Sequence, residues 1–243
     1  MRMWTFAGRN AKEILRDPLN LSTGLGFPLV ILLLLSIIQA NIPVSLFEID
    51  RLTPGITVFG LSFMTLFSAL LIARDRGSAL FQRLYTTPMT PGDFILGYTL
   101  PLIPIALGQC VICYIAAFFL GLELTANLLY ALAGILPVSL MYIAIGLLCG
   151  SVLNDKQVGG ICGSILTNLS AWLSGIWFDL ELLGGTFGKI ANALPFVHAV
   201  EMERAALAGD LGGILPHLWW VLGYTAALMA LAVWCFLRQM NKQ

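Results

Sequence analysis

Ala73–Tyr98 reads ARDRGSALFQRLYTTPMTPGDFILGY and separates two long apolar runs of the chain. It is rich in charge for this sequence, so we expect a loop that leaves the membrane. Four apolar residues in it recur at the i, i+1, i+4 and i+5 spacing of one helical face: Leu80, Phe81, Leu84 and Tyr85. Thr87 and Pro88 end this short helix, because proline lacks an amide proton and disfavours helical geometry in the residue before it. The apolar face predicts a protein partner; the alternative is a helix that lies on the lipid headgroups.

The composition assigns the chain to the membrane proteins. Hydrophobic residues make up 58% and charged residues 11% of the sequence, whereas a soluble domain carries about 25% charged residues. The formal net charge is zero, which gives no indication of nucleic-acid binding. All five cysteines lie within apolar runs, so we expect small buried side chains, not disulfides or a zinc site. We therefore expect an all-α integral membrane protein, with one transmembrane domain over residues 1–243.

The first 18 residues predict an amphipathic helix in the membrane interface. Projected at about 100° per residue, the apolar residues fill one half of the helix and the basic residues gather on the other. The basic residues are spread along about four turns, unlike those of a secretory signal, which precede a continuous apolar core. We expect Trp4 at the headgroups and Arg9, Lys12 and Arg16 against anionic lipid.

Six apolar segments are each long enough to cross about 30 Å of hydrocarbon. Pro101 and Pro104 are expected to bend the third, and Pro137 the fourth. The expected spans are Leu21–Ala40, Gly55–Ala73, Phe94–Leu120, Asn127–Leu153, Val158–Phe178 and Leu215–Leu237.

Basic residues are distributed unequally between the two sides of these spans. With the N-terminus inside, ten lie on the cytoplasmic side and three, Arg51, Lys189 and Arg204, on the outer side. Because an excess of Lys and Arg marks the cytoplasmic side, we expect both termini and the loop 73–93 in the cytoplasm.

The outer segment 179–215 differs from the other loops in its length. It predicts two helical pieces, Thr186–Leu194 and Val197–Ala208, which Pro195 separates. Both are apolar enough to dip into the outer leaflet as a broken, re-entrant pair, provided that protein or a water-filled cavity covers the break.

Motifs of catalysis and metal binding are weak. Gly184–Lys189 hints at a phosphate loop, but its glycine spacing is one residue short and Ile190 replaces the required Ser or Thr. Cys110 and Cys113 lie within a predicted span without a nearby His or acid. His198 and Glu201 are more typical of a surface hydrogen bond than of a metal site. We therefore expect no catalytic, cofactor or metal site in the chain.

No ionisable residue falls in the middle of a predicted span. Ion-coupled transporters and proton relays usually need such groups at membrane depth. If the protein moves a substrate uphill, the energy is expected to come from another chain.

The whole chain resembles the ABC-2 type exporter permeases. The resemblance rests on the interfacial helix, the six spans, the broken outer helix pair and two motifs. These motifs are Arg83-Leu84-x-x-Thr87-Pro88-Met89 with Gly97 beyond it, and Leu194-Pro195…His198-Ala199…Glu201 through Arg204-Ala205…Gly209. The chain departs from the family in the spacing between Gly77 and Pro88, so the usual acidic contact residue is not carried over.

The resemblance implies a half-transporter. Its coupling helix would dock on an ABC ATPase through Arg76, Leu80, Phe81, Arg83, Leu84, Tyr85, Thr87 and Pro88. Two ATPase copies would hold ATP and Mg²⁺, since the 243 residues contain no Walker motif. A second permease copy, identical or related, would complete the complex in a bacterial or archaeal inner membrane.

The family architecture also implies a substrate path where spans one, two and five meet. Phe59, Phe63 and Phe67 form a stripe on span two, and span five offers Asn168 and Trp172. Aromatic surfaces suit varied apolar cargo; the alternative for the stripe is ordinary helix packing. We expect export of an amphipathic or lipid-like substrate such as a drug, antibiotic or peptide-like molecule. The alternatives are a polysaccharide or lipid-linked glycan exporter, and a membrane immunity or sensor protein without transport activity.

Overall fold

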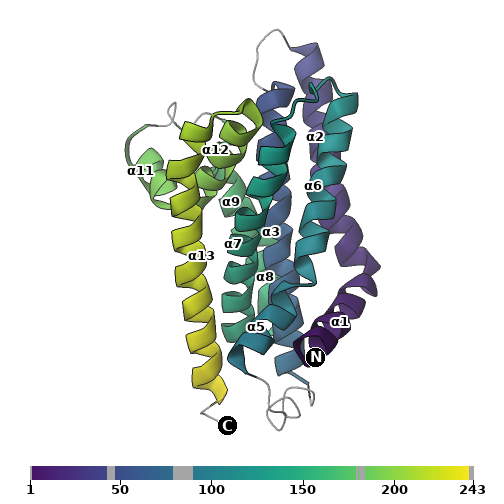
Figure 1. The fold of residues 1–243 in the computed structure, drawn as a ribbon, viewed down its shortest axis with the longest axis vertical. Coiled ribbons are helices and arrows are strands. Elements are labelled where there is room, and N and C mark those ends of the chain that lie inside the picture. The colour runs from purple at the N-terminus through teal and green to yellow at the C-terminus, as the bar shows by residue number, and fades with distance from the viewer. Residues whose placement is uncertain (1, 43–46, 79–89, 179, 181–183, 241–243) are drawn as a thin grey trace.

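The computed structural model describes residues 2–42, 47–78, 90–178, 180 and 184–240, and these residues form helices and short connections without any strand. Long helices run side by side along one axis (Figure 1). Helix α1 lies across one end of this bundle, and α11 and α12 lie at the other. We call these the α1 end and the α12 end.

Helix α1 (Arg2–Leu15) is the predicted interfacial helix, and it ends before residue 18. The chain turns there because Asp17 caps the next helix, α2 (Pro18–Asn41): its carboxylate accepts a hydrogen bond from the backbone amide of Asn20 at 3.3 Å. Pro18 occupies the first turn, where a missing amide proton costs no hydrogen bond. The change of direction between α1 and α2 therefore has a local cause.

In the described part of the chain, five helical segments are long and apolar enough to cross a membrane, and each overlaps a predicted span. They are α2, α3 (Ile49–Arg76), the segment Gly92–Phe119, α7 (Leu128–Val152) and α13 (Leu211–Met240). The third span breaks into α5 (Pro91–Thr99) and α6 (Leu102–Phe119) at Pro101, as the sequence predicted. Helix α7, in contrast, continues through Pro137.

The predicted span Val158–Phe178 is not confirmed as a membrane-crossing helix. This part of the chain is helical in three pieces: α8 (Asp155–Gly160), the π-helical η1 (Ile161–Leu166) and α9 (Thr167–Leu173). The hydroxyl of Thr167 donates to the carbonyl of Cys162, five residues back, in keeping with the wider π turn. The helix ends at Leu173, and the chain turns at Gly175, where φ is +70°.

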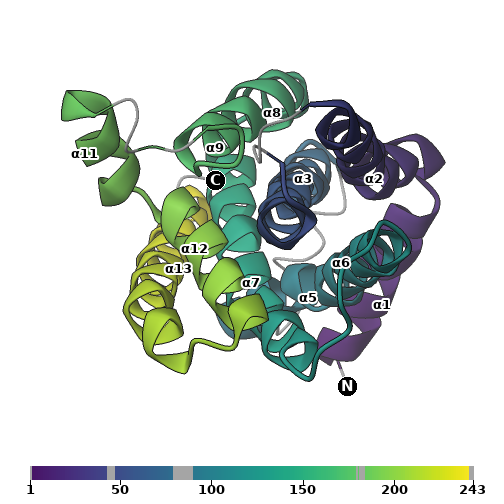
Figure 2. The ribbon, with the colours of Figure 1, turned by 90° about the horizontal axis from the view of Figure 1, so that it is seen from above.

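Helix α3 forms the centre of the bundle. Viewed along the bundle, it lies inside a ring of α2, α6, α7, α8 and α9 (Figure 2). Its closest neighbour is α7, where Gly146 and Gly150 have no side chain and so allow the two backbones to approach. The backbones are close enough for the hydroxyl of Thr65 to donate a 2.8 Å hydrogen bond to the carbonyl of Tyr142.

The broken helix pair is α11 (Gly185–Ala193) and α12 (Pro195–Ala208), with Pro195 at the start of α12. Gly209 ends α12 in the left-handed conformation, with φ of +77°. Helix α12 packs against α13, α3 and α7, whereas α11 lies at the side of the bundle (Figure 2). The two helical pieces are confirmed, and their depth in the bilayer stays a prediction.

Candidate functional site

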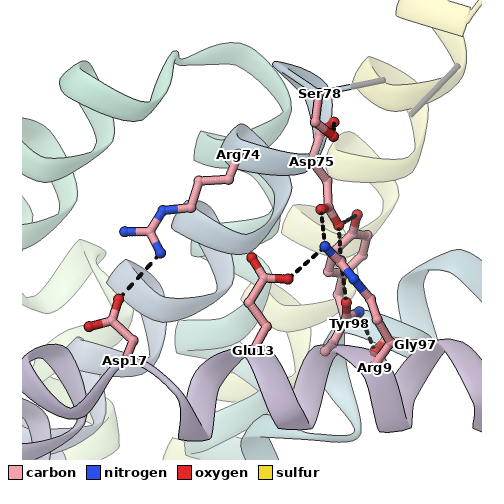
Figure 3. A network of polar contacts seen from close by, with 9 residues as sticks. Arg9, Glu13, Asp17, Arg74, Asp75, Ser78, Gly97 and Tyr98 are labelled. Atoms are coloured by element: carbon pink, nitrogen blue, oxygen red, sulfur yellow. Dashed lines mark hydrogen bonds and ion pairs between the residues drawn. The ribbon is translucent and has the colours of Figure 1, made fainter. Parts of the chain in front are cut away.

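The strongest polar cluster of the described residues lies at the α1 end, around the carboxylate of Asp75. Arg9 of α1 donates to both oxygens of this carboxylate, at 2.6 and 2.7 Å, and Tyr98 of α5 donates to it at 2.7 Å (Figure 3). The Asp75 side chain is only 2% exposed. A bidentate guanidinium–carboxylate pair is among the stronger polar contacts in proteins, so Asp75 ties α1, α3 and α5 together.

Close packing supports the same junction. Phe6 of α1 lies over Gly97 of α5, where a Cβ atom would overlap its ring. The ring of Phe6 also stacks on Phe94 and meets Tyr98 edge-on, with centroids 5.8 and 5.0 Å away. Asn10 completes the contact by donating a 3.0 Å hydrogen bond to the carbonyl of Gly97. Glycine at position 97 therefore permits α1 to dock.

Arg9 pairs with a second acid, which lies on its own helix. Glu13, one turn along α1, forms a second ion pair with Arg9 at 2.6 Å. Partial burial raises the pKa of the Glu13 carboxyl above its usual value, and the positive charge of Arg9 opposes this shift. Because two carboxylates share one guanidinium, neutralising either one leaves the other with a partner.

The last turn of α3 makes contacts in two further directions. Arg74 pairs with Asp17 at the start of α2 at 3.3 Å and with Asp155 at the start of α8 at 3.5 Å. Arg76 donates to carbonyl oxygens at the end of α7, the nearer at 2.8 Å. The end of α3 is therefore bonded to the starts of α2 and α8 and to the ends of α5 and α7.

The predicted docking residues adjoin this cluster. Arg76 is the last residue of α3, and the others lie outside the described residues: Leu80, Phe81, Arg83, Leu84, Tyr85, Thr87 and Pro88. The two flanks of that segment are described. Ser78 donates to the carbonyl of Asp75 at 2.8 Å on one side, and Thr90 and Asp93 form a reciprocal capping box at the start of α5 on the other.

The four predicted interfacial residues have different surroundings. Trp4 and Lys12 are exposed on α1, and Arg16 is exposed directly after its end. Arg9 is turned toward the protein and binds Asp75, an acid that lies 66 positions away and that helical periodicity cannot indicate.

The predicted substrate-path residues fall into two groups. Phe59, Phe63 and Phe67 are buried along α3 and face α2, where Phe27 lies about 6 Å from the first two rings. Asn168 and Trp172 lie on α9 and are exposed, Trp172 to 55%. Within one chain the phenylalanine stripe packs against a neighbouring helix, and the exposed face of α9 is left uncovered. A role of either group in transport stays a prediction.

Glu203 is a buried acid that the sequence analysis missed. It lies on α12, outside the predicted spans, yet its side chain is completely buried beside Gly134 of α7. Neither of its carboxylate oxygens has a hydrogen-bond partner among the described residues. Burial raises the pKa of the Glu203 carboxyl well above its usual value. The sequence analysis considered ionisable residues within the predicted spans only, and Glu203 lies outside them. The burial of Glu203 could have been predicted from its spacing, because it shares one face of α12 with the small apolar residues Ala199 and Ala206.

His198 also has a different partner from the expected one. Its Nδ1 atom lies 2.9 Å from Nδ1 of His217 on α13, and its Nε2 atom lies 3.0 Å from the carbonyl oxygen of Asn192. Its ring stacks on Trp220 at 4.7 Å. Glu201 pairs instead with Arg204, at 2.7 Å. Among the described residues, no group of three or more His, Cys, Asp or Glu side chains is arranged for a metal ion.

Comparison with known proteins adds one positive finding. The family described as ABC-2 type transporter matches residues 1–208, which include every described element from α1 to α12. A search of curated proteins found no match to the chain.

Proposed function

The chain belongs to the ABC-2 type transporter family, and from this premise we propose that it is the membrane subunit of an ATP-driven exporter of amphipathic or lipid-like molecules. The resemblance read from its motifs is thereby confirmed at the level of the family. It is a multi-pass permease component of an ABC transporter, a family that generally works with an ABC ATPase subunit.

The observation that carries the proposal is the position of the Asp75 cluster. Asp75 precedes the segment 79–89 and Tyr98 follows it, and the two side chains are hydrogen-bonded to each other. A partner that moves this segment would therefore act on α3 and α5 together, and on α1 through Arg9. Such a bonded junction between three helices supports a role in passing movement from an ATPase to the bundle.

The charge distribution supports a cytoplasmic α1 end. Ten of the 13 basic residues belong to segments at this end by the topology read from the sequence, and an excess of basic residues marks the cytoplasmic side. In this orientation both chain termini and the segment 79–89 face the ATPase, and α11 and α12 face outward.

The proposed complex contains two copies of the permease and two of the ATPase, with ATP and Mg²⁺ bound by the ATPase. The exposed apolar face of η1 and α9, with Ile165, Leu169 and Trp172, supports a contact beyond this chain. We assign that face to the second permease copy and to the substrate passing between the copies.

Transport in oriented vesicles tests the proposal. The chain is co-expressed with an ABC ATPase encoded beside it, and inside-out membrane vesicles are supplied with ATP and an amphipathic fluorescent dye. We expect ATP-dependent uptake that is lost when the ATPase is catalytically inactive. Uptake by right-side-out vesicles alone would show import and contradict the proposed export. An ATPase that never co-purifies with the chain would overturn the subunit assignment.

A further inference from the structure

A cavity of about 1150 Å³ opens at the α12 end, between the start of α3, the turn after α9, and helices α11 and α12. Its apolar wall includes Ile176, Trp177 and Phe178. Its charged residues are Arg51, Lys189, Arg204 and Glu201. The three basic residues are all those that the topology assigns to the outer side of the membrane. Their convergence on one cavity is a property of the fold, because they lie on α3, α11 and α12.

Among the described residues that line the cavity, basic side chains outnumber acidic ones. Glu201, the acidic residue among them, is already paired with Arg204 at 2.7 Å. Arg204 also donates to the carbonyl oxygens of Arg51 and Gly175, at 3.3 and 3.2 Å, so its guanidinium is held in place. Arg51 and Lys189 form no ion pair with any residue that the structure describes. Within the described part of the chain, no acid is paired with these two cations.

The start of α11 adds a second feature that favours an anion. Gly184, Gly185 and Gly188 line the cavity beside Lys189, and no side chain of the described residues caps the amide groups of this helix end. The first amides of a helix carry partial positive charge and bind anions. This is the sequence that hinted at a phosphate loop. Its spacing does not fit a nucleotide-binding loop, but the structure supplies the parts of a simpler anion site.

Aromatic rings connect the cavity with the exposed face of α9. The ring of Phe178 lies 5.7 Å from that of Trp172 and 6.3 Å from that of Phe187 on α11. An apolar tail along these rings would place its charged end among Arg51, Lys189 and the start of α11. We propose that the cavity binds an amphipathic molecule with an anionic headgroup, phosphate or carboxylate, as it leaves the transporter; this rests on the proposed export function.

The neighbouring cavity limits where the headgroup sits. This second cavity, of about 580 Å³, is lined by Asp50, Glu123, Glu201 and Asp210, and shares Arg51 and Arg204 with the first. Its acidic residues repel an anion, so the headgroup binds on the side of Lys189 and α11.

Binding of defined probes to the full chain in phosphatidylcholine nanodiscs tests the site without an ATPase. The probes are dodecyl phosphate, dodecylphosphocholine, which has the same tail and no net charge, and inorganic phosphate. We expect dodecyl phosphate to bind more tightly than dodecylphosphocholine, and inorganic phosphate to compete only weakly. Equal binding of the two amphiphiles would overturn the anionic headgroup. Displacement by inorganic phosphate at similar concentrations would overturn the amphipathic ligand in favour of a free anion.

Charge-removing variants assign the binding to this cavity. Arg51→Gln and Lys189→Gln should each weaken dodecyl phosphate binding about fivefold, as expected for one partly exposed ionic contact. Lys189→Arg should retain the affinity, and so should Lys156→Gln, which removes an exposed charge at the α1 end. Unchanged binding in both cavity variants, or an equal loss in Lys156→Gln, would overturn the site. Either result leaves the vesicle assay for export untouched, so the two proposals can fail separately.

Discussion

The hydroxyl of Tyr98 donates a 2.7 Å hydrogen bond to the carboxylate of Asp75, across 23 positions of the chain. The residues between them include the segment predicted to dock on the ATPase. The same carboxylate binds Arg9 of α1, so one acid joins the helix before the segment, the helix after it and the interfacial helix. The stability and the coupling of the transporter are therefore expected to depend on this acid.

Asp75→Asn keeps the size of the side chain and removes its charge. We expect a loss of about 1–3 kcal/mol in the free energy of unfolding, because a charged hydrogen bond in a buried place is replaced by a neutral one. ATPase stimulation by substrate should fall in parallel. The control is Asp155→Asn, in an exposed pair with Arg74, which should change stability by less than about 1 kcal/mol. Denaturant titration in mixed micelles measures both, and similar losses in the two variants would contradict the central role of Asp75.

Gly97→Ala should displace α1 from α5. The added Cβ overlaps the ring of Phe6, and overpacking of this kind typically costs about 1–3 kcal/mol. Gly108→Ala is the matched control, because a Cβ there meets nothing within 4 Å. Thermal unfolding measures the effect. If the overlap is the cause, Phe6→Ala should cost less in the Gly97→Ala background than in the native chain; equal costs in both would argue against it.

Leu84→Asp and Tyr85→Asp test the predicted docking face. Truncation or reversal of a buried apolar anchor at an interface costs about 2 kcal/mol or more. Both variants should therefore lose the ATPase during purification while the chain remains in the membrane. Leu124→Asp, at an exposed position between α6 and α7, should retain it. Normal co-purification of both docking variants would exclude this face as the main contact.

The stability of the α12 end should depend on His198 in mild acid. Burial lowers the pKa of His198 in the folded chain, and Glu201 opposes this effect. The unfolded chain takes up a proton near pH 6.5, so the contribution of neutral His198 is complete above about pH 6.5 and is lost as the pH falls below it. Protonation would also place hydrogen on both ring nitrogens of His198, one of which faces Nδ1 of His217.

Melting temperatures between pH 7.5 and 5.5 measure this dependence. The melting temperature of the native chain relative to that of His198→Asn should fall as the pH is lowered toward 5.5, whereas its value relative to Tyr130→Phe, which leaves the histidine pair intact, should not change. Parallel curves for the native chain and His198→Asn would contradict the prediction.

Glu203→Gln should leave the chain as stable or make it more stable at neutral pH. Since burial raises the pKa of Glu203, the folded chain keeps a proton that the unfolded chain releases above about pH 4.5. The contribution of the protonated acid is therefore complete at low pH and is lost as the pH rises toward the folded-state pKa. The variant should remove this loss, so its advantage over the native chain should grow from pH 4.5 to pH 8. A variant that is less stable at pH 8 would show that the charged carboxylate has a function in the fold.

Much of the fold follows from local sequence. The spans are predictable because a bilayer of fixed thickness requires apolar runs of a given length. The helix breaks at Pro101 and Pro195 are predictable because proline has no amide proton for the hydrogen bond that would continue the preceding helix. The predicted fifth span extends too far along the chain. The sequence remains apolar beyond Leu173, but the helix ends at that residue and the backbone turns at Gly175.

The candidate sites depend on packing between residues that are distant in the chain. Helical periodicity places Arg9 on the basic face of α1, but only the position of α3 gives it Asp75 as a partner. Glu203 is buried because α12 packs between other helices, not because its neighbours in the chain are unusually apolar. Arg51, Lys189 and Arg204 are far apart in the sequence, and the fold brings them to one cavity. Span length and helix ends are governed by adjacent residues, whereas charge pairing and burial are governed by which helices come into contact.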